Sequence, residues 1–138
     1  MMRRHWIFTS PQLSLYEAEL LMRAAGIRQV PVISGDALVG VLGHRDLLRA
    51  ALERVLERPL ELVKDLLATL PVADVMNRKP PTATPSESLV DVARRMVDEH
   101  LCCLPVVEEE GDRLLMVGLV VESDLLRIAY APVGAAGS

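Results

Sequence analysis

The sequence contains few aromatic residues and no excess of positive charge. Two tyrosines, one tryptophan and one phenylalanine make up 3% of the 138 residues, too few to provide the stacking platforms that bind unpaired bases. The net charge is −4 and the isoelectric point is about 5.4, so the chain lacks the basic surface that nucleic acid requires. We therefore expect no nucleic acid partner.

The chain also lacks a cysteine framework. Its two cysteines, Cys102 and Cys103, are sequence neighbours that would point to opposite faces of a strand, an arrangement that suits a disulfide poorly. His100 lies close by, but this spacing matches no common zinc pattern, so we expect no metal. The cysteine usage favours a reducing compartment, and we expect a cytoplasmic protein.

Membrane segments, leader sequences and catalytic motifs are not evident. The longest apolar run, Leu114–Val121, is interrupted by Gly118 and is far too short to span a bilayer as a helix. Residues 1–6 carry positive charge without an apolar stretch behind them, so we expect no signal peptide. Glycine loops for phosphate, nucleophile elbows and H-E-x-x-H motifs are missing too. We expect neither an enzyme nor a membrane partner.

What the sequence does contain is a repeat. Apolar residues make up 51% of the chain, enough to build a core, and many of them recur in two copies. The offset between the copies grows where residues 34–36 correspond to 108–113, and we assign this change to a longer hairpin loop. At an offset of 74 the identical pairs are Pro11/Pro85, Ser14/Ser88, Leu15/Leu89, Met22/Met96, Pro31/Pro105 and Val32/Val106, and at an offset of 78 they are Val39/Val117, Gly40/Gly118 and Asp46–Arg49/Asp124–Arg127.

Each copy predicts the same helices. Ser14 and Ser88 are good N-caps, and the apolar residues after them recur at helical spacing. Gly26 ends the first helix, whereas His100 occupies the equivalent position in the second copy, where a left-handed backbone is less favourable. The last helices of the two copies begin near His44 and Glu122.

Two strands lie between the helices of each copy. We expect the first at 29–33 and 103–107, and the proline inside each one restricts it to a sheet edge. The second strands, 37–42 and 114–121, are almost continuously apolar, which predicts burial on both faces.

A helical connector separates the copies. Apolar residues extend the helix that begins at His44 as far as Pro59, which breaks this helix or starts another one. A second amphipathic stripe follows, which would cover the edge of the module or contact a second protomer. Its members are Val63, Leu66, Leu67 and Leu70. We divide the chain into a first repeat at 1–58, a connector at 59–71, a second repeat at 72–131 and a flexible tail at 132–138.

The ordered motifs resemble those of a tandem pair of cystathionine-β-synthase (CBS) domains. The features are a helix with L-x₆-M, a strand with h-P-V, a G-h-h-x-x-x-D-L-L turn and a D-V-M lead-in at 74–76. They fall at Leu15…Met22, Val30-Pro31-Val32 and Gly40–Leu48, and again at Leu89…Met96, Leu104-Pro105-Val106 and Gly118–Leu126. The resemblance implies an α+β (α/β-like) fold of two β-α-β-β-α repeats packed as a pseudo-two-fold disc, or Bateman-type module. One unit alone has too few strands to be stable.

The resemblance also implies a regulatory function. Clefts between the repeats of such pairs bind adenosine-containing ligands such as AMP, ADP, ATP, S-adenosylmethionine or NAD-type molecules, which act as regulators and not as required cofactors. CBS pairs commonly dimerise, so we expect a homodimer and a regulated protein partner. The alternative is a module with degenerate clefts that bind no ligand and serve dimerisation or protein docking.

The family motif places a ribose-binding carboxylate at Asp46 and Asp124, since an ionised carboxylate can accept two hydrogen bonds from a 2′,3′-diol. An aspartate in the first helical turn also completes capping boxes, so a structural role is the alternative. The family's Thr or Ser three residues earlier is replaced by Gly43 and Val121. Three residues lie near these helix starts: His44, Arg45 and Ser123. They would contact a phosphate, or they are simply solvated side chains at the start of a helix.

The remaining ligand contacts implied by the resemblance are apolar or precede the first helices. Thr9 and Thr82 correspond to positions that line the cleft in relatives. The adenine would lie against strand edges, although core packing is the alternative explanation for apolar residues there. These residues are Ile27, Val30 and Pro31 in the first copy and Leu101, Leu104 and Pro105 in the second.

Overall fold

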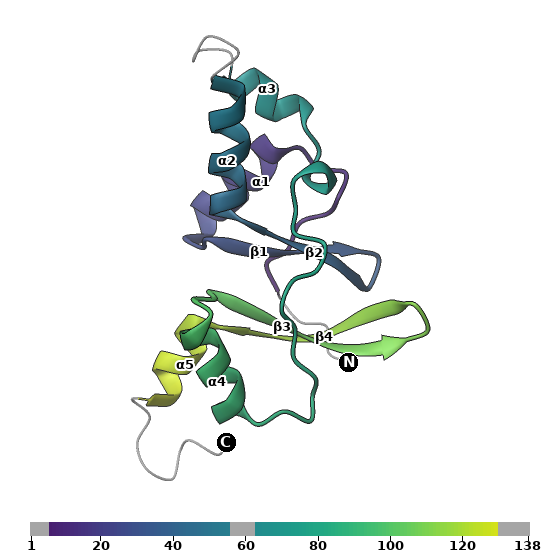
Figure 1. Cartoon of the computed structure of the whole chain (residues 1–138), viewed down its shortest axis with the longest axis vertical. Coiled ribbons are helices and arrows are strands. Elements are labelled where there is room, and N and C mark those ends of the chain that lie inside the picture. Colours follow the sequence, from purple (N-terminus) through teal and green to yellow (C-terminus); the bar gives the residue numbers. More distant parts are fainter. Residues whose placement is uncertain (1–5, 56–62, 130–138) are drawn as a thin grey trace.

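The computed structural model describes residues 6–55 and 63–129, which form two lobes with their strands facing each other and their helices at opposite ends (Figure 1). The α+β fold predicted from the sequence is confirmed. The first lobe contains α1 (Leu15–Ala25), β1 (Gln29–Ser34), β2 (Ala37–Gly43), α2 (His44–Val55), α3 (Val63–Thr69) and the 3₁₀ turn η2 (Val72–Asp74), and the second contains α4 (Leu89–Asp98), β3 (Cys103–Glu110), β4 (Arg113–Val121) and α5 (Glu122–Ala129).

The first helix of each repeat is capped as the sequence predicts. The Ser14 hydroxyl accepts a hydrogen bond from the Glu17 N–H, and the Glu17 side chain accepts one from the Ser14 N–H, which completes a capping box. Ser88 accepts from the Asp91 N–H at 3.1 Å. Gly26 ends α1 with φ +68°, and His100 adopts φ +56° after α4, a conformation that favours glycine.

The four strands form one sheet in the order β1-β2-β4-β3, so the two strands that contain a proline lie at its edges, as predicted. The remaining strand of each β-α-β-β-α unit is reduced to a single parallel bridge, Thr9 with Val32 and Ala83 with Val106. At the first bridge the Thr9 N–H donates to the Pro31 carbonyl at 3.0 Å. The proline is tolerated because this contact needs only its carbonyl.

The prediction that the second repeat has a longer hairpin loop than the first is wrong. Both hairpins turn through two residues, and each turn contains a glycine, Gly35 or Gly111, with φ above +60°. The extra residues extend the ladder instead, because Glu108–Glu110 pair with Arg113–Leu115. The longer strands bring the second hairpin against the first, where the Met116 N–H donates to the Asp36 carbonyl at 3.1 Å.

A small apolar cluster joins the two lobes. Ile33 and Leu38 of the first hairpin pack against Val107 and Met116 of the second, and Trp6 covers the cluster. Arg113 and Asp36 form an ion pair beside it, and Ala37 pairs with Leu115 across the central strands. The repeats therefore share a core, as their small individual size requires.

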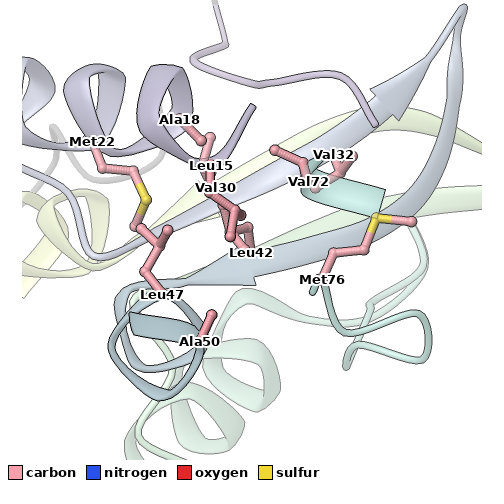
Figure 2. Close-up of a cluster of buried hydrophobic side chains, with 10 residues drawn as sticks. All are labelled: Leu15, Ala18, Met22, Val30, Val32, Leu42, Leu47, Ala50, Val72 and Met76. Atoms are coloured by element: carbon pink, nitrogen blue, oxygen red, sulfur yellow. The ribbon is translucent and has the colours of Figure 1, made fainter. Parts of the chain in front are cut away.

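The main core lies in the first lobe (Figure 2). It includes Val72 and Met76, which follow the connector in sequence but pack against α1 and the first hairpin. The Val72 N–H donates to the Leu13 carbonyl at 2.7 Å, and the backbones of Asn77 and Val41 exchange hydrogen bonds of 2.9 and 3.0 Å. This segment thus completes the first lobe before the chain crosses to the second.

Strand β4 differs from the prediction that both apolar strands are buried on two faces. Four successive residues of β2, Gly40–Gly43, are buried, whereas within β4 Met116 alone is buried. The bridge to Asn77 covers β2 at Val41. For the corresponding residue of β4, Leu119, the described part of the chain provides no such bridge, so β4 stays half-exposed.

Only part of the connector can be compared with the prediction. Helix α3 falls within the expected amphipathic stripe, and Leu67 and Leu70 pack against the core of the first lobe. Residues 56–62, including Pro59, and the predicted tail at 132–138 lie outside the described residues. On α2, Leu48 and Leu52 are exposed. Among the helices that are described, none is long and apolar enough to cross a bilayer.

Candidate functional site

A cavity of about 530 Å³ lies between the two repeats, and we call it the Asp124 cleft. The first repeat contributes the segment after α1 and the start of β1, and the second contributes the end of β4 and the first turn of α5. A cavity of this size, with apolar walls and a few polar groups, suits a small-molecule ligand. Its lining residues include Ile7, Ile27, Pro31, Leu119, Ser123 and Asp124.

The wall of this cleft is held by contacts between the repeats. The Gln29 side-chain oxygen accepts hydrogen bonds from the backbone N–H groups of Cys102 at 2.8 Å and Cys103 at 3.3 Å. Arg28 Nη2 lies 3.9 Å from Glu122 Oε1, although both side chains are mostly exposed, which makes this pair weak. The amide contact, which is partly buried, is therefore the stronger positioning element.

Asp46 and Asp124 hold the starts of their helices in the same way. The Gly43 N–H donates to Asp46 Oδ2 at 2.8 Å, and the Val121 N–H donates to Asp124 Oδ2 at 3.1 Å. Each contact is the reciprocal half of a capping box, which needs no hydroxyl at the N-cap. This geometry explains how Gly43 and Val121 can replace the family's Thr or Ser without loss of the helix start.

The two aspartates nevertheless face different surroundings. Asp124 lines the cleft between the repeats. Asp46 lines a separate cavity of about 260 Å³ with Arg49, Glu53 and Asp74, whose remaining walls are Ala50, Leu70 and Val75. Arg49 Nη1 lies 3.9 Å from Asp46 Oδ1. The structure therefore brings only Asp124 next to the predicted apolar contacts Ile27 and Pro31.

A second cavity between the repeats, of about 750 Å³, is the pseudo-symmetric counterpart of the Asp124 cleft, and we call it the His44 cleft. The offsets of 74 and 78 convert Ile27 into Leu101 and Ser123 into Arg45, and both equivalents line it. Asp46 is absent from its wall. The lining residues are Arg28, Gln29, Gly43, His44, Arg45, Leu48, Glu99, His100, Leu101 and Cys102.

Several predicted contacts lie elsewhere. Val30 and Leu104, which the resemblance implies as adenine contacts, have no exposed surface, belong to the cores of the two lobes and line neither of the two clefts. Pro105 is also fully buried.

The two threonines are not part of the described cleft walls. Thr9 is buried, and its hydroxyl has no hydrogen-bond partner within the described structure. The Thr82 carbonyl accepts a hydrogen bond from Arg95 Nη1 at 2.8 Å. Neither residue lines the Asp124 cleft or the His44 cleft.

Several cleft residues were missed by sequence reasoning. Arg28, Gln29 and Cys102 line both clefts, and Trp6 and Ile7 line the Asp124 cleft. Arg28 and Gln29 stand between a helix-ending glycine and an apolar strand, and two long polar side chains at that place are the signal that could have found them.

The adjacent cysteines have different surroundings. Burial, together with smaller effects of the nearby Cys102 and Glu122, raises the pKa of Cys103 from the ordinary thiol value of 9.0 to about 12. Cys102 is half-exposed at the boundary of both clefts. Within residues 6–55 and 63–129, no three His, Cys, Asp or Glu side chains meet as a metal site.

Comparison with known proteins identifies the family. The CBS domain model matches residues 1–53 and 72–131. The chain therefore belongs to the CBS domain family and carries a tandem pair, as its motifs predict. The matches begin and end close to the repeats assigned from the sequence, while the structure packs residues 72–77 against the first lobe.

Individual relatives agree with this assignment. An inosine-5′-monophosphate dehydrogenase of Korarchaeum cryptofilum is 36% identical over 122 residues, which are 88% of this chain and 22% of that protein. This chain thus spans about a fifth of that enzyme, so the match does not extend to most of it.

Solved structures show the same fold. The putative acetoin utilization protein AcuB of Vibrio cholerae is 30% identical with a TM-score of 0.71, over 94% of this chain and 86% of that one. CBSX2, a CBS-pair protein of Arabidopsis thaliana, has been solved in complex with AMP; that structure is 26% identical with a TM-score of 0.69, over 92% of this chain and 89% of that one.

Proposed function

We propose that this chain is a regulatory module that binds an adenosine-containing ligand in the Asp124 cleft. The observation that carries the proposal is the meeting of Asp124 and Ser123 from one repeat with Ile27 and Pro31 from the other around one cavity of about 530 Å³. The AMP complex of the related CBSX2 supports the same ligand class.

The chemistry of the walls fits the parts of such a ligand. Ile27, which is half-buried in the wall of the cleft, offers apolar surface to an adenine ring, and the Asp124 carboxylate can accept hydrogen bonds from a ribose diol. A carboxylate has two oxygens and about four acceptor positions, so one group can hold the helix start and a diol together. Ser123, at the N-terminus of α5, would donate to a first phosphate.

Thermal unfolding against AMP, ADP, ATP, S-adenosylmethionine and NADH tests this function. A ligand at about a hundred times its dissociation constant adds about 2.7 kcal/mol to stability, which shifts Tm by several degrees. If no member of the panel shifts Tm at millimolar concentration, the nucleotide function is wrong and the docking module becomes the better account.

The two aspartates provide a matched pair of variants. Asp124→Asn and Asp46→Asn each retain an oxygen that can accept the N-cap N–H, so both should cost similar stability. Only Asp124→Asn should weaken the ligand, by about tenfold or more, because a hydrogen bond to a charged group is worth about 1.5–3 kcal/mol. Equal loss of affinity in both variants would argue that Asp124 is not the ribose contact.

We also propose that the module forms a homodimer through α2. Leu48 and Leu52 lie one turn apart on this helix, so they share a face, and they are 51% and 63% exposed. Leu52→Glu would place a charge on that face and should convert the dimer to a monomer in light scattering after gel filtration. A monomeric parent chain would refute this assembly without affecting the ligand proposal.

A further inference from the structure

The described wall of the Asp124 cleft contains more acidic than basic side chains. Glu122 and Asp124 are its acids, and Arg28 is the single base among the described residues that line it. Arg28 Nη2 lies 3.9 Å from Glu122 Oε1, so a carboxylate of one repeat partly offsets the guanidinium of the other. Within the described wall, an incoming phosphate therefore meets no cation without an opposing carboxylate beside it.

The N-terminus of α5 does not make up for this shortage of positive charge. A helix N-terminus normally favours an anion, but the first turn of α5 already contains the carboxylates of Glu122 and Asp124. Asp124 Oδ2 also accepts a hydrogen bond from the Val121 N–H. The charge of Glu122 is felt inside the cleft, since it adds to burial, the main cause of the raised pKa of Cys103. The helix start is therefore already supplied with anions.

We infer that the Asp124 cleft takes an adenosyl ligand with at most one phosphate, and that Glu122 is the residue that selects against longer phosphate chains. This inference rests on the proposed function and defines the ligand class of that same site. Ser123 would donate to a first phosphate, and Glu122 directly precedes it in the first turn of α5. A second or third phosphate would add negative charge close to this carboxylate, and such a repulsive element is enough to reject one ligand in favour of another.

The fluorescence of Trp6 provides a test that is specific to this cleft. Trp6 is the single tryptophan of the chain, and it lines the Asp124 cleft but not the His44 cleft. The full chain is titrated with adenosine, AMP, ADP and ATP without Mg²⁺, which would neutralise the phosphates. Affinity should fall from AMP to ADP to ATP, with ATP about tenfold or more weaker than AMP, because like charges brought together oppose binding.

Substitution of the selecting acid shows whether charge or size sets the preference. Glu122→Gln should raise the affinity for ATP relative to AMP by about fivefold, whereas adenosine, which has no phosphate, should bind as it does to the parent chain. Glu99→Gln is the matched control, since it removes the same charge from the wall of the His44 cleft and should change the ratio by less than about twofold. Higher salt should narrow the ratio in the parent chain, because salt screens exposed charges.

The outcomes separate this inference from the proposed function. The inference is overturned if ATP binds the parent chain at least as tightly as AMP, or if Glu99→Gln changes the ratio of the two affinities as much as Glu122→Gln does. Either result leaves the proposed function standing, because AMP still binds in the cleft beside Trp6. If neither adenosine nor AMP alters the Trp6 fluorescence or Tm, the proposed function itself fails, and the inference fails with it.

Discussion

The two repeats share a sequence pattern and a fold but differ in what packs against them. In the first lobe, η2 and the segment that ends at Asn77 close over α1 and β2. The second lobe, within the described residues, has a smaller core of Ala83, Val92, Met96 and Leu104. The comparison teaches that the first lobe is the more firmly packed half, whereas the second supplies a half-exposed strand and the carboxylate of the cleft.

The largest expected contrast is between the equivalent leucines at the start of the first helices. Leu15 has no exposed surface, whereas Leu89 is 43% exposed. Leu15→Ala should lower the free energy of unfolding by about 2–5 kcal/mol, and Leu89→Ala by less than about 1 kcal/mol. Urea unfolding of both variants measures the difference. Similar losses would mean that the two lobes are packed alike.

A smaller contrast concerns the equivalent glycines of β2 and β4. A Cβ at Gly40 would lie 2.8 Å from the Asn77 carbonyl oxygen, whereas at Gly118 the nearest atom is Val106 Cβ at 3.3 Å. Gly40→Ala must displace backbone and should cost about 1–3 kcal/mol, while Gly118→Ala should cost less because its nearest contact is longer and requires a smaller shift of Val106. If Gly118→Ala proves the more damaging in urea unfolding, the segment at Asn77 does not pack closely on β2.

At the ends of the first helices, substitutions of the two equivalent residues should change the free energy of unfolding in opposite directions. Gly26 and His100 both have a left-handed backbone, which penalises side chains. Gly26→Ala should therefore lose about 1 kcal/mol, and His100→Gly should gain up to about 1 kcal/mol after the added entropy of the unfolded chain. Thermal unfolding checks both, and a destabilised His100→Gly would show that the imidazole has a structural contact that offsets the strain.

The smallest contrast is between the neighbouring cysteines. Cys103 is 5% exposed with its pKa raised to about 12, so it should react with iodoacetamide far more slowly than Cys102 when each is left alone by Cys102→Ala or Cys103→Ala. Between pH 9 and 12 the unfolded thiol ionises and the folded one does not. Stability should accordingly fall as pH rises through that window, and Cys103→Ala should remove this component. Equal labelling rates would contradict the buried position.

Much of the fold followed from the sequence because the motifs occur twice in the same order. The N-caps, the edge strands with their prolines and the helix ends at Gly26 and His100 depend on local backbone chemistry, which the sequence carries directly. The packing of Val72 and Met76 onto the first lobe could not be predicted, since it depends on the path of the chain after the connector. The longer second hairpin was misjudged because the alignment gave its length but not its pairing.

The site was only partly predictable, because it too depends on how segments that are distant in the sequence pack together. The aspartate motif located the two helix starts, but not which of them faces a cleft between the repeats. That depends on how the lobes pack, as do the contributions of Gln29 and Arg28. Strand periodicity indicates that Val30 and Leu104 face the opposite side of their strands from Pro31 and Pro105, but it could not show that all four residues are buried.

The central claim is that the two clefts are not equivalent and that the adenosyl ligand occupies the one beside Asp124. Amide chemical-shift mapping with AMP, which locates the ligand without any substitution, tests it most directly. The account predicts the largest shifts at Ile27–Gln29 and Glu122–Asp124, with small changes at Gly43–Asp46. Shifts of equal or greater size at Gly43–Asp46 would contradict it.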